Sequence, residues 1–163
     1  MIRALDRIAL VSRELVDSMS DIVWAVDPQK DHLSDLVQRM REVASALLES
    51  DGRVVTFNGP DSRAIERIDM PTDRRRHLLL FFKEAVTNVS RHARANRVSI
   101  DVRVSVTALT LVITDDGCGF DTATVRRGNG LTSLEARARQ LGGEIDIQSL
   151  VGHGTTVLLT VPA

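Results

Sequence analysis

Residues 110–120 read TLVITDDGCGF and contain the pattern that decides the fold. The β-branched residues at its start predict a strand over residues 109–114. Asp115 follows at the end of this strand, and Gly117 and Gly119 come shortly after it. A glycine lets the backbone approach a bound group closely because it has no Cβ atom. A carboxylate at a strand end followed by two glycines therefore indicates a loop that can contact a ligand.

Upstream of this loop the sequence predicts a long helix. It begins after a proline, with Thr72 or Asp73 as the candidate N-cap, and extends to about Ala93. Its apolar residues fall within one broad arc of the helix: Leu78, Phe81, Phe82, Ala85, Val86 and Val89. Glu84 and Asn88 lie one turn apart at the edge of this arc, where a side chain can leave the core and still face a cleft.

Two further glycine motifs follow downstream. Residues 128–131 read GNGL and begin a helix that ends at the glycines 142–143. Glycines at a helix start expose N–H groups that suit phosphate oxygens. Residues 152–156 read GHGTT and predict the turn of a hairpin between strands 144–149 and 155–161. A lone Gly-x-Gly is usually only a turn, so the order and context of all the motifs carry the functional interpretation.

The remaining elements complete an α/β pattern. An amphipathic helix is predicted over residues 33–49, because its apolar residues share one face. Strands are predicted over residues 53–57 and 97–104, and residues 64–68 are interpreted as a short edge strand. The arginines at 74–76 are interpreted as a solvated helix start rather than a nucleic-acid patch. The expected fold is a two-layer α/β sandwich, in which a mixed sheet of about five strands packs against roughly three helices.

The N-terminal residues 1–26 have a different pattern. Their apolar residues alternate gaps of three and four and are interrupted only by Ser12: Leu5, Ile8, Leu15, Met19, Ile22 and Val26. One isolated helix cannot bury such a stripe, so the pattern predicts a helix of a dimeric bundle. The alternative is a core helix of the same domain. Pro28 ends this helix and begins a short connector to Asp31.

The composition excludes several classes of protein. The 163 residues carry 21 basic and 22 acidic side chains, so no bulk charge favours nucleic acid or an anionic membrane. Cys118 is the only cysteine, which suits a reducing compartment. No apolar run reaches the roughly 18 residues that a membrane span needs, so a cytoplasmic location is expected. Aromatic residues make up 3% of the chain, which argues against a base-stacking surface.

The motifs resemble, in this order, those of the Bergerat ATP-binding fold that histidine kinases share with gyrase-type topoisomerases and related ATPases. Residues 83–93 (KEAVTNVSRHA) resemble the N box, 115–119 the G1 box, 128–130 the G2 box and 152–156 the G3-like turn. Within that group, the Asn-x-x-Arg-His-Ala pattern and residues 130–143 look most like sensor kinases whose partners are LuxR/NarL-type response regulators.

This resemblance implies ATP and Mg²⁺ as ligands and assigns roles to individual residues. Glu84 would position the attacking group as the catalytic residue. Asn88 would offer a neutral oxygen to Mg²⁺, and Asp115 would accept the exocyclic N–H of adenine. The implied ATP-binding set is Asn88, Arg91, His92, Asp115, Gly117, Gly119, Gly128, Gly130, Leu131, Thr155 and Thr156. Lys83, Arg126 and Arg127 are further candidates for neutralising phosphate charge.

The resemblance also implies a division of the chain and a reaction. Residues 1–27 would be the second helix of a dimerisation and phosphoacceptor bundle, and residues 28–163 the ATP-binding catalytic domain. The γ-phosphate would pass to a histidine of the dimerisation domain and then to an aspartate of a response regulator. The expected partners are that domain of the same kinase, as a homodimer, and a LuxR/NarL-type regulator. Neither nucleic acid nor direct membrane contact is expected of this segment, although upstream segments could anchor the parent protein in a membrane.

The chain departs from the family at the phosphoacceptor. In sensor kinases the acceptor histidine is usually followed by an acidic residue, whereas here Leu, Leu, Ala and Gly follow the four histidines: His32, His77, His92 and His153. We therefore expect no phosphoacceptor in this chain. We expect a piece of a larger kinase rather than a degenerate protein, because every nucleotide motif is intact. The alternatives are an anti-sigma-factor serine kinase of the same fold and a non-catalytic ATP-binding or dimerisation module.

Overall fold

The computed structural model describes residues 19, 23–24, 27, 30–49, 52–122 and 129–163. Most of the apolar seam predicted over residues 1–26 therefore lies outside the described residues, as does Pro28. Among the described residues, no helix has the length and apolarity needed to span a membrane.

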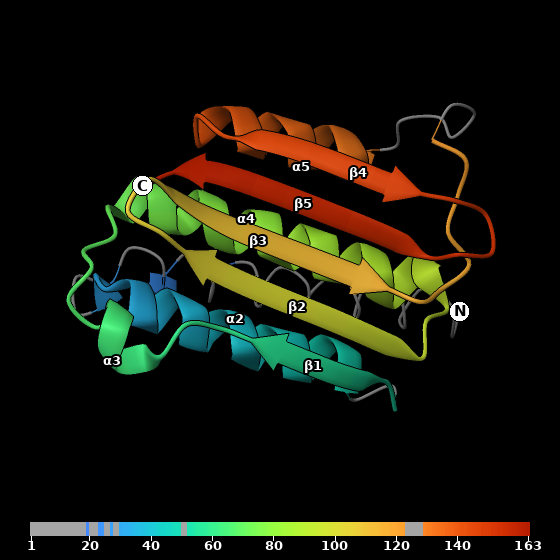
Figure 1. The fold of residues 1–163 in the computed structure, drawn as a ribbon, viewed down its shortest axis with the longest axis horizontal. Helices are drawn as coiled ribbons and strands as arrows, with labels where there is room; N and C mark the ends of the chain where they lie inside the picture. The colour runs from blue at the N-terminus through green and yellow to red at the C-terminus, as the bar shows by residue number, and fades with distance from the viewer. Residues whose placement is uncertain (1–18, 20–22, 25–26, 28–29, 50–51, 123–128) are drawn as a thin grey trace, which may run out of the picture.

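The described residues form a five-stranded sheet in the order β1-β2-β3-β5-β4 (Figure 1). Its strands are β1 Val54–Asn58, β2 Arg97–Val104, β3 Ala108–Asp115, β4 Glu144–Ser149 and β5 Thr155–Pro162. The first two strands pair in parallel and the other neighbours are antiparallel. The predicted mixed sheet is thus confirmed, and the bounds of its five strands lie within one residue of the expected ones.

The long helices cover one face of this sheet (Figure 1). They are α2 Leu33–Leu48, α4 Thr72–Asn88 and α5 Asn129–Gln140, and a π-helical turn, Val89–Ala93, continues α4. Period-two alternation turns the buried residues of β2, β3 and β5 toward these helices: Val98, Ile100, Val102, Leu109, Leu111, Ile113, Val157, Leu159 and Val161. The predicted two-layer α/β sandwich is confirmed.

Two local predictions were wrong. Residues 64–68 form no strand, because α3 Ser62–Ile65 is a short helix at that place. The Asp61 side chain accepts the Arg63 N–H at 2.9 Å and caps this helix, which buries Ile65. In addition, neither Thr72 nor Asp73 caps α4. Its N-cap is Pro71, which provides no side-chain hydrogen bond, so the two predicted caps lie inside the first turn.

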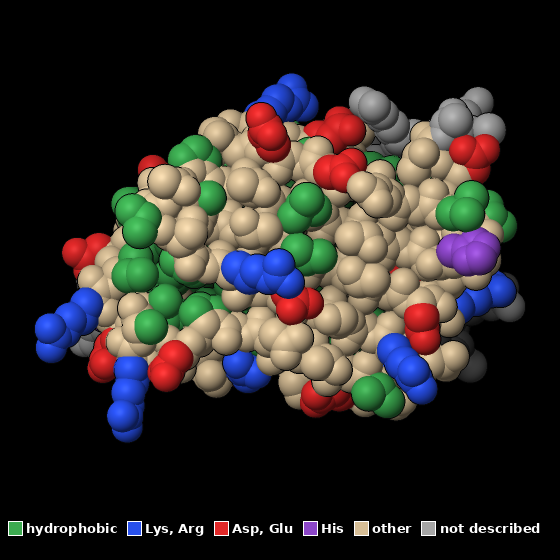
Figure 2. All heavy atoms as spheres, in the orientation of Figure 1, with side chains coloured by type: hydrophobic (Ala, Val, Ile, Leu, Met, Phe, Trp, Pro, Cys, Tyr) green, Lys and Arg blue, Asp and Glu red, His purple; other side chains and the backbone are tan. Residues whose placement is uncertain are grey.

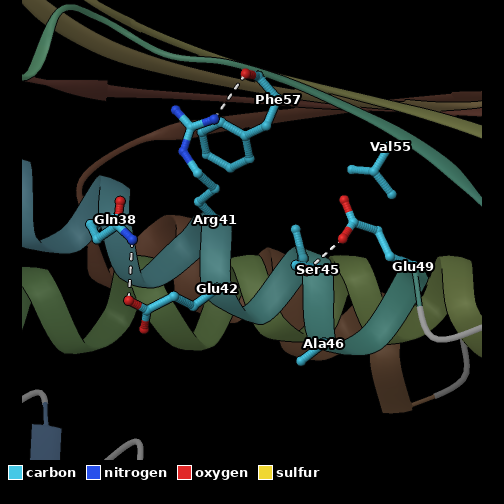
Figure 3. A pocket seen from close by; sticks show the side chains of 9 residues that line it. Gln38, Arg41, Glu42, Ser45, Ala46, Glu49, Val55 and Phe57 are labelled. Carbon is cyan, nitrogen blue, oxygen red and sulfur yellow. Dashed lines mark hydrogen bonds between the residues drawn. The ribbon is translucent and has the colours of Figure 1, made fainter.

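Among the described residues, no helix covers the opposite face of the sheet (Figure 1), and Figure 2 shows this face as mostly uncharged, with scattered charged side chains. A groove of about 580 Å³ lies at the β1 edge, between that strand and α2 (Figure 3). There the Arg41 guanidinium lies 4.4 Å from the centre of the Phe57 ring and donates to the Phe57 carbonyl oxygen at 3.2 Å. None of the residues predicted to bind ATP lines this groove.

Candidate nucleotide-binding site

The last two turns of α4 bring the predicted catalytic and metal-binding residues to the start of α5. Glu84 and Asn88 are half-buried. A Cβ atom added to Gly130 would lie 2.9 Å from Glu84 Oε1 and 3.0 Å from Asn88 Oδ1. A side chain at this position would displace the tips of Glu84 and Asn88, so the glycine lets the first turn of α5 approach them closely. The first turn of α5 therefore lies directly beside the oxygen atoms of Glu84 and Asn88.

The carboxylate of Asp115 is held at the end of β3. Its exposed fraction is 5%, and it accepts the Gly117 backbone N–H at 2.8 Å. Burial raises the pKa of Asp115, and the negative charge of Asp116 adds to this effect. The backbone N–H groups of Gly117 and Thr155 oppose the rise because they stabilise the ionised form. Asp115 is thus a buried acceptor whose orientation is set by the main chain.

The glycines around Asp115 mark close backbone contacts between separate segments. A Cβ atom on Gly117 would lie 2.1 Å from the Ala93 carbonyl oxygen, and one on Gly119 would lie 2.1 Å from that of Leu150. At Gly154 the corresponding distance to the Asp115 carbonyl oxygen is 2.0 Å, and its φ is +78°. No side chain fits at these positions, so the loop after β3 packs main chain to main chain against the end of α4 and the β4–β5 turn.

The π-helical turn was not predicted, although the helix was expected to extend to Ala93. The Ala93 carbonyl oxygen accepts the Cys118 N–H at 2.7 Å, and the His92 carbonyl oxygen accepts the Cys118 S–H at 3.3 Å. The turn ends at Arg94, whose φ of 52° is left-handed. Arg91 and His92, both predicted to bind ATP, are exposed on this turn. π-Helical turns inside helices often lie at functional sites.

The acidic and hydroxyl residues near Asp115 have separate roles. Asp116 is exposed and accepts the Asn96 and Arg97 N–H groups, both at 2.8 Å, and these bonds lower its pKa. It therefore fastens the loop to the start of β2, whereas the neighbouring Asp115 is buried. Thr155 is paired with Asp115 across β3 and β5, so both lie on the helix-covered face of the sheet.

The structure does not bring every predicted residue to this place. Thr156 follows Thr155 and lies on the opposite face of the sheet, where its hydroxyl is 3.2 Å from that of Thr114. Leu131 is half-buried and packs against the core from the first turn of α5. Gly128, Arg126 and Arg127 lie outside the described residues.

Sequence reasoning missed two supporting side chains. The Ser149 hydroxyl accepts the Phe120 N–H at 2.9 Å and donates to the Gly154 carbonyl oxygen at 3.0 Å, and no motif pointed to it. Arg137 of α5 is half-buried, and burial lowers its pKa while the charge of Glu84 raises it. Its signal was present in the sequence, because Arg137 lies within residues 130–143 (GLTSLEARARQLGG), the stretch that resembles sensor kinases.

Comparison with known proteins identifies the family. The family described as histidine kinase-, DNA gyrase B- and HSP90-like ATPase matches residues 73–163. A sensor-like histidine kinase of Chloroflexus aurantiacus is 41% identical over 92 residues, which is 52% of this chain and 15% of that protein. The signal transduction histidine-protein kinase/phosphatase DegS of Brevibacillus brevis is 28% identical over 130 residues, 78% of this chain and 32% of DegS. The chain thus spans a third or less of the length of these relatives.

Solved structures agree with this family. The histidine kinase domain of a blue-light activated histidine kinase from Erythrobacter litoralis superposes with a TM-score of 0.62 at 25% identity, covering 78% of this chain and 60% of that one. The catalytic domain of the histidine kinase ThkA shares the fold, with a TM-score of 0.62 at 12% identity over 80% of this chain and 93% of that one. The chain belongs to the family of histidine kinase-, DNA gyrase B- and HSP90-like ATPases, and its ATP-binding domain is of the sensor histidine kinase type.

Proposed function

We propose that the chain binds ATP with Mg²⁺ at this site and transfers the γ-phosphate to a histidine. The proposal depends on one observation: the π-helical turn joins two chemically different ends of the candidate site. Glu84 and Asn88 meet the first turn of α5, and the π-helical turn leads from Asn88 to the loop of the buried carboxylate Asp115. One end offers a fixed acceptor, and the other offers oxygen atoms beside a helix N-terminus.

At the first end, Asp115 would bind the base. Its carboxylate would accept the exocyclic N–H of adenine, and its burial would strengthen this bond relative to one in water. Gly117 and Gly119 would hold the loop that passes close to the base and sugar, since the main chain at Ala93 and Leu150 already occupies the space that their side chains would need. Thr155 would assist through the backbone N–H that it donates to Asp115.

At the second end, Asn88 would hold the metal ion. The described residues contain no group of three or more His, Cys, Asp or Glu that could bind a metal. This fits Mg²⁺, which commonly takes one or two protein oxygens and completes its shell with phosphate oxygens and water. When bound, Mg²⁺ would neutralise charge on the phosphates. The N-terminus of α5 at Gly130, the guanidinium of Arg91 and the imidazole N–H of His92 would bind phosphate oxygens.

Glu84 would be the catalytic residue. Phosphoryl transfer depends mainly on alignment and on charge stabilisation, and a carboxylate beside the phosphates can orient the attacking imidazole and accept the proton of its other ring nitrogen. The histidine would lie on a dimerisation domain outside these residues. Residues 1–27 would contribute a helix to that domain and 28–163 would form the catalytic domain. The protein would act in the cytoplasm as a homodimer and pass phosphate to a response regulator, of the LuxR/NarL type on the basis of the sequence motifs.

Labelling with radioactive ATP tests this proposal. The chain alone should show no acid-labile phosphohistidine, because no acceptor nitrogen is aligned with the γ-phosphate. Adding a separate acceptor bundle from a related sensor kinase should produce slow labelling, since the two partners lack a high effective concentration. A Glu84→Gln variant is the matched control, and it should bind ATP with about the same affinity but transfer at least about a hundredfold more slowly.

Two outcomes would contradict the proposal. Self-labelling that survives replacement of His32, His77, His92 and His153 together would identify a serine or threonine kinase of this fold. Equal transfer by the wild-type and Glu84→Gln proteins would remove Glu84 from the reaction.

A further inference from the structure

Arg75 is buried, although the three arginines at residues 74–76 were interpreted as a solvated helix start. It lies in the first turn of α4, and its exposed fraction is 0%, whereas Arg76 is exposed. The interpretation of residues 74–76 as a solvated helix start is therefore wrong for Arg75. A buried guanidinium is costly unless hydrogen-bond acceptors surround it, so its partners identify what buries it.

The acceptors of Arg75 lie near the N-terminus of the chain, before α2. Its Nη1 atom donates to Asp31 Oδ1 at 2.7 Å and to the Lys30 carbonyl oxygen, and its Nη2 atom donates to the Asp27 carbonyl oxygen at 3.1 Å. The guanidinium also lies 5.8 Å from the centre of the Trp24 ring. The planar fork of an arginine can bond several acceptors at once, which a lysine cannot do in the same geometry.

A second set of hydrogen bonds joins the residues around Asp31 to residues 68–70, just before α4. The Met70 N–H donates to the Asp31 carbonyl oxygen at 2.7 Å, and the Leu33 N–H donates to the Ile68 carbonyl oxygen at 2.8 Å. His32 forms a bridge with Asp69, and its Nδ1 atom is 3.3 Å from Asp69 Oδ1. The described residues before α2 are thus held between the chain at Ile68–Met70 and the side chain of Arg75.

We propose that Arg75 is a positioning residue that docks the described residues before α2, among them Trp24, Asp27 and Asp31, onto the start of α4. Glu84 and Asn88 lie further along the same helix, and Asn88 is about 20 Å from Arg75 at 1.5 Å per residue. Docking at one end of a rigid helix sets the direction of the segment relative to the site at the other end. Any effect of this direction on phosphotransfer rests on the proposed function, whereas the docking itself does not.

The sole tryptophan provides a direct test in the full 163-residue chain without nucleotide. In an Arg75→Met variant, acrylamide quenching of Trp24 should increase severalfold, and hydrogen exchange at the Met70 amide should accelerate about tenfold, equivalent to about 1.4 kcal/mol. Exchange in β3 should stay within about twofold of wild type, because the opening is local.

ATP affinity, measured separately, should also stay within about twofold. Arg76→Met, which removes the same charge from an exposed neighbour, is the matched control and should leave both probes unchanged.

The proposal is overturned if Arg75→Met and Arg76→Met give the same Trp24 quenching and the same Met70 exchange. If Arg75→Met does not fold, Asp31→Asn replaces it, because this carboxylate is half exposed and its loss leaves the backbone acceptors in place. We expect about threefold faster Met70 exchange in that variant. Unchanged exchange and quenching in Asp31→Asn would equally overturn the docking role. If the wild-type chain did not bind ATP, the proposed function would be contradicted. Trp24 quenching and Met70 exchange would still test the docking.

Discussion

The two ends of the candidate site are built in different ways. Around Asp115, backbone meets backbone, and a Cβ atom on Gly154 would lie 2.0 Å from a carbonyl oxygen. Beside α5, a Cβ atom on Gly130 would meet the tips of Glu84 and Asn88, at 2.9 and 3.0 Å. Side-chain tips can rotate away, whereas backbone held in a sheet cannot. Substitutions of the glycines at the Asp115 end should therefore lower folding stability. Substitutions at the Asn88 end should weaken ligand binding with little change in stability.

The largest expected effect is at Gly154. Gly154→Ala should lower the free energy of unfolding by about 3 to 5 kcal/mol, because a left-handed residue acquires both strain and a backbone clash. Gly152→Ala is the matched control, since Gly152 has a φ of +82° but no atom within 4 Å of an added Cβ. It should cost only about 1 to 2 kcal/mol. Chemical denaturation would measure both values, and equal losses would show that the Asp115 end is not rigid.

Asp115 should dominate the affinity for nucleotide. Asp115→Asn should weaken ATP binding about a hundredfold, the effect of losing a hydrogen bond to a charged acceptor, while the protein stays folded. Asp116→Asn should leave the affinity within about threefold, because Asp116 bonds the backbone of Asn96 and Arg97 and is exposed. Calorimetric titration separates the two variants. If their affinities were equal, Asp115 would have no role in the site.

Asn88 tests the other end of the site. Asn88→Ala should weaken ATP binding about tenfold when Mg²⁺ is present and about twofold or less without it, since the side chain is proposed to hold the metal. Asn88→Asp keeps an oxygen ligand and should retain the Mg²⁺ dependence. The free energy of unfolding, measured by thermal denaturation, should change by less than about 1 kcal/mol in both variants. The same loss with and without Mg²⁺ would contradict the metal role.

The smallest effect is a pH dependence of opposite sign at two adjacent carboxylates. The pKa of Asp115 is raised above 3.8, so the folded state binds a proton that the unfolded state releases, and stability falls as pH rises through this window. The pKa of Asp116 is lowered below 3.8, so its stabilisation is present above that value and is lost as pH falls. Denaturation from about pH 3 to about pH 7 should show Asp115→Asn gaining stability relative to wild type as pH rises. Asp116→Asn should show the reverse, and curves of the same slope would refute both assignments.

Much of the architecture could be predicted because its signals are local. Residues 97–104 and 144–149 were predicted as strands with the bounds that the structure has for β2 and β4. Alternation and helical periodicity record which face is buried, and burial is what shapes these elements. The short helix α3 was missed because its few residues show no clear period, and the cap at Asp61 decided its form.

The motifs indicated the residues of the candidate site but not its geometry. The structure places Glu84 and Asn88 beside Gly130, and it joins the loop after Asp115 to Ala93 through the Cys118 N–H. Thr155 and Thr156 could not be separated by motif alone. Their roles differ because strand pairing puts Thr155 opposite Asp115 and turns Thr156 to the other face of the sheet.

The sequence by itself determined the five strands, the long helices, their buried faces and the family, because periodicity and short motifs depend on neighbouring residues. Only the tertiary structure decided the state of Arg75, whose acceptors Asp31 and Asp27 lie 44 and 48 residues away along the chain. The same holds for the contact of Ala93 with the loop after β3. A buried polar group must find partners wherever the fold brings them, so its environment depends on long-range contacts that a local pattern does not contain.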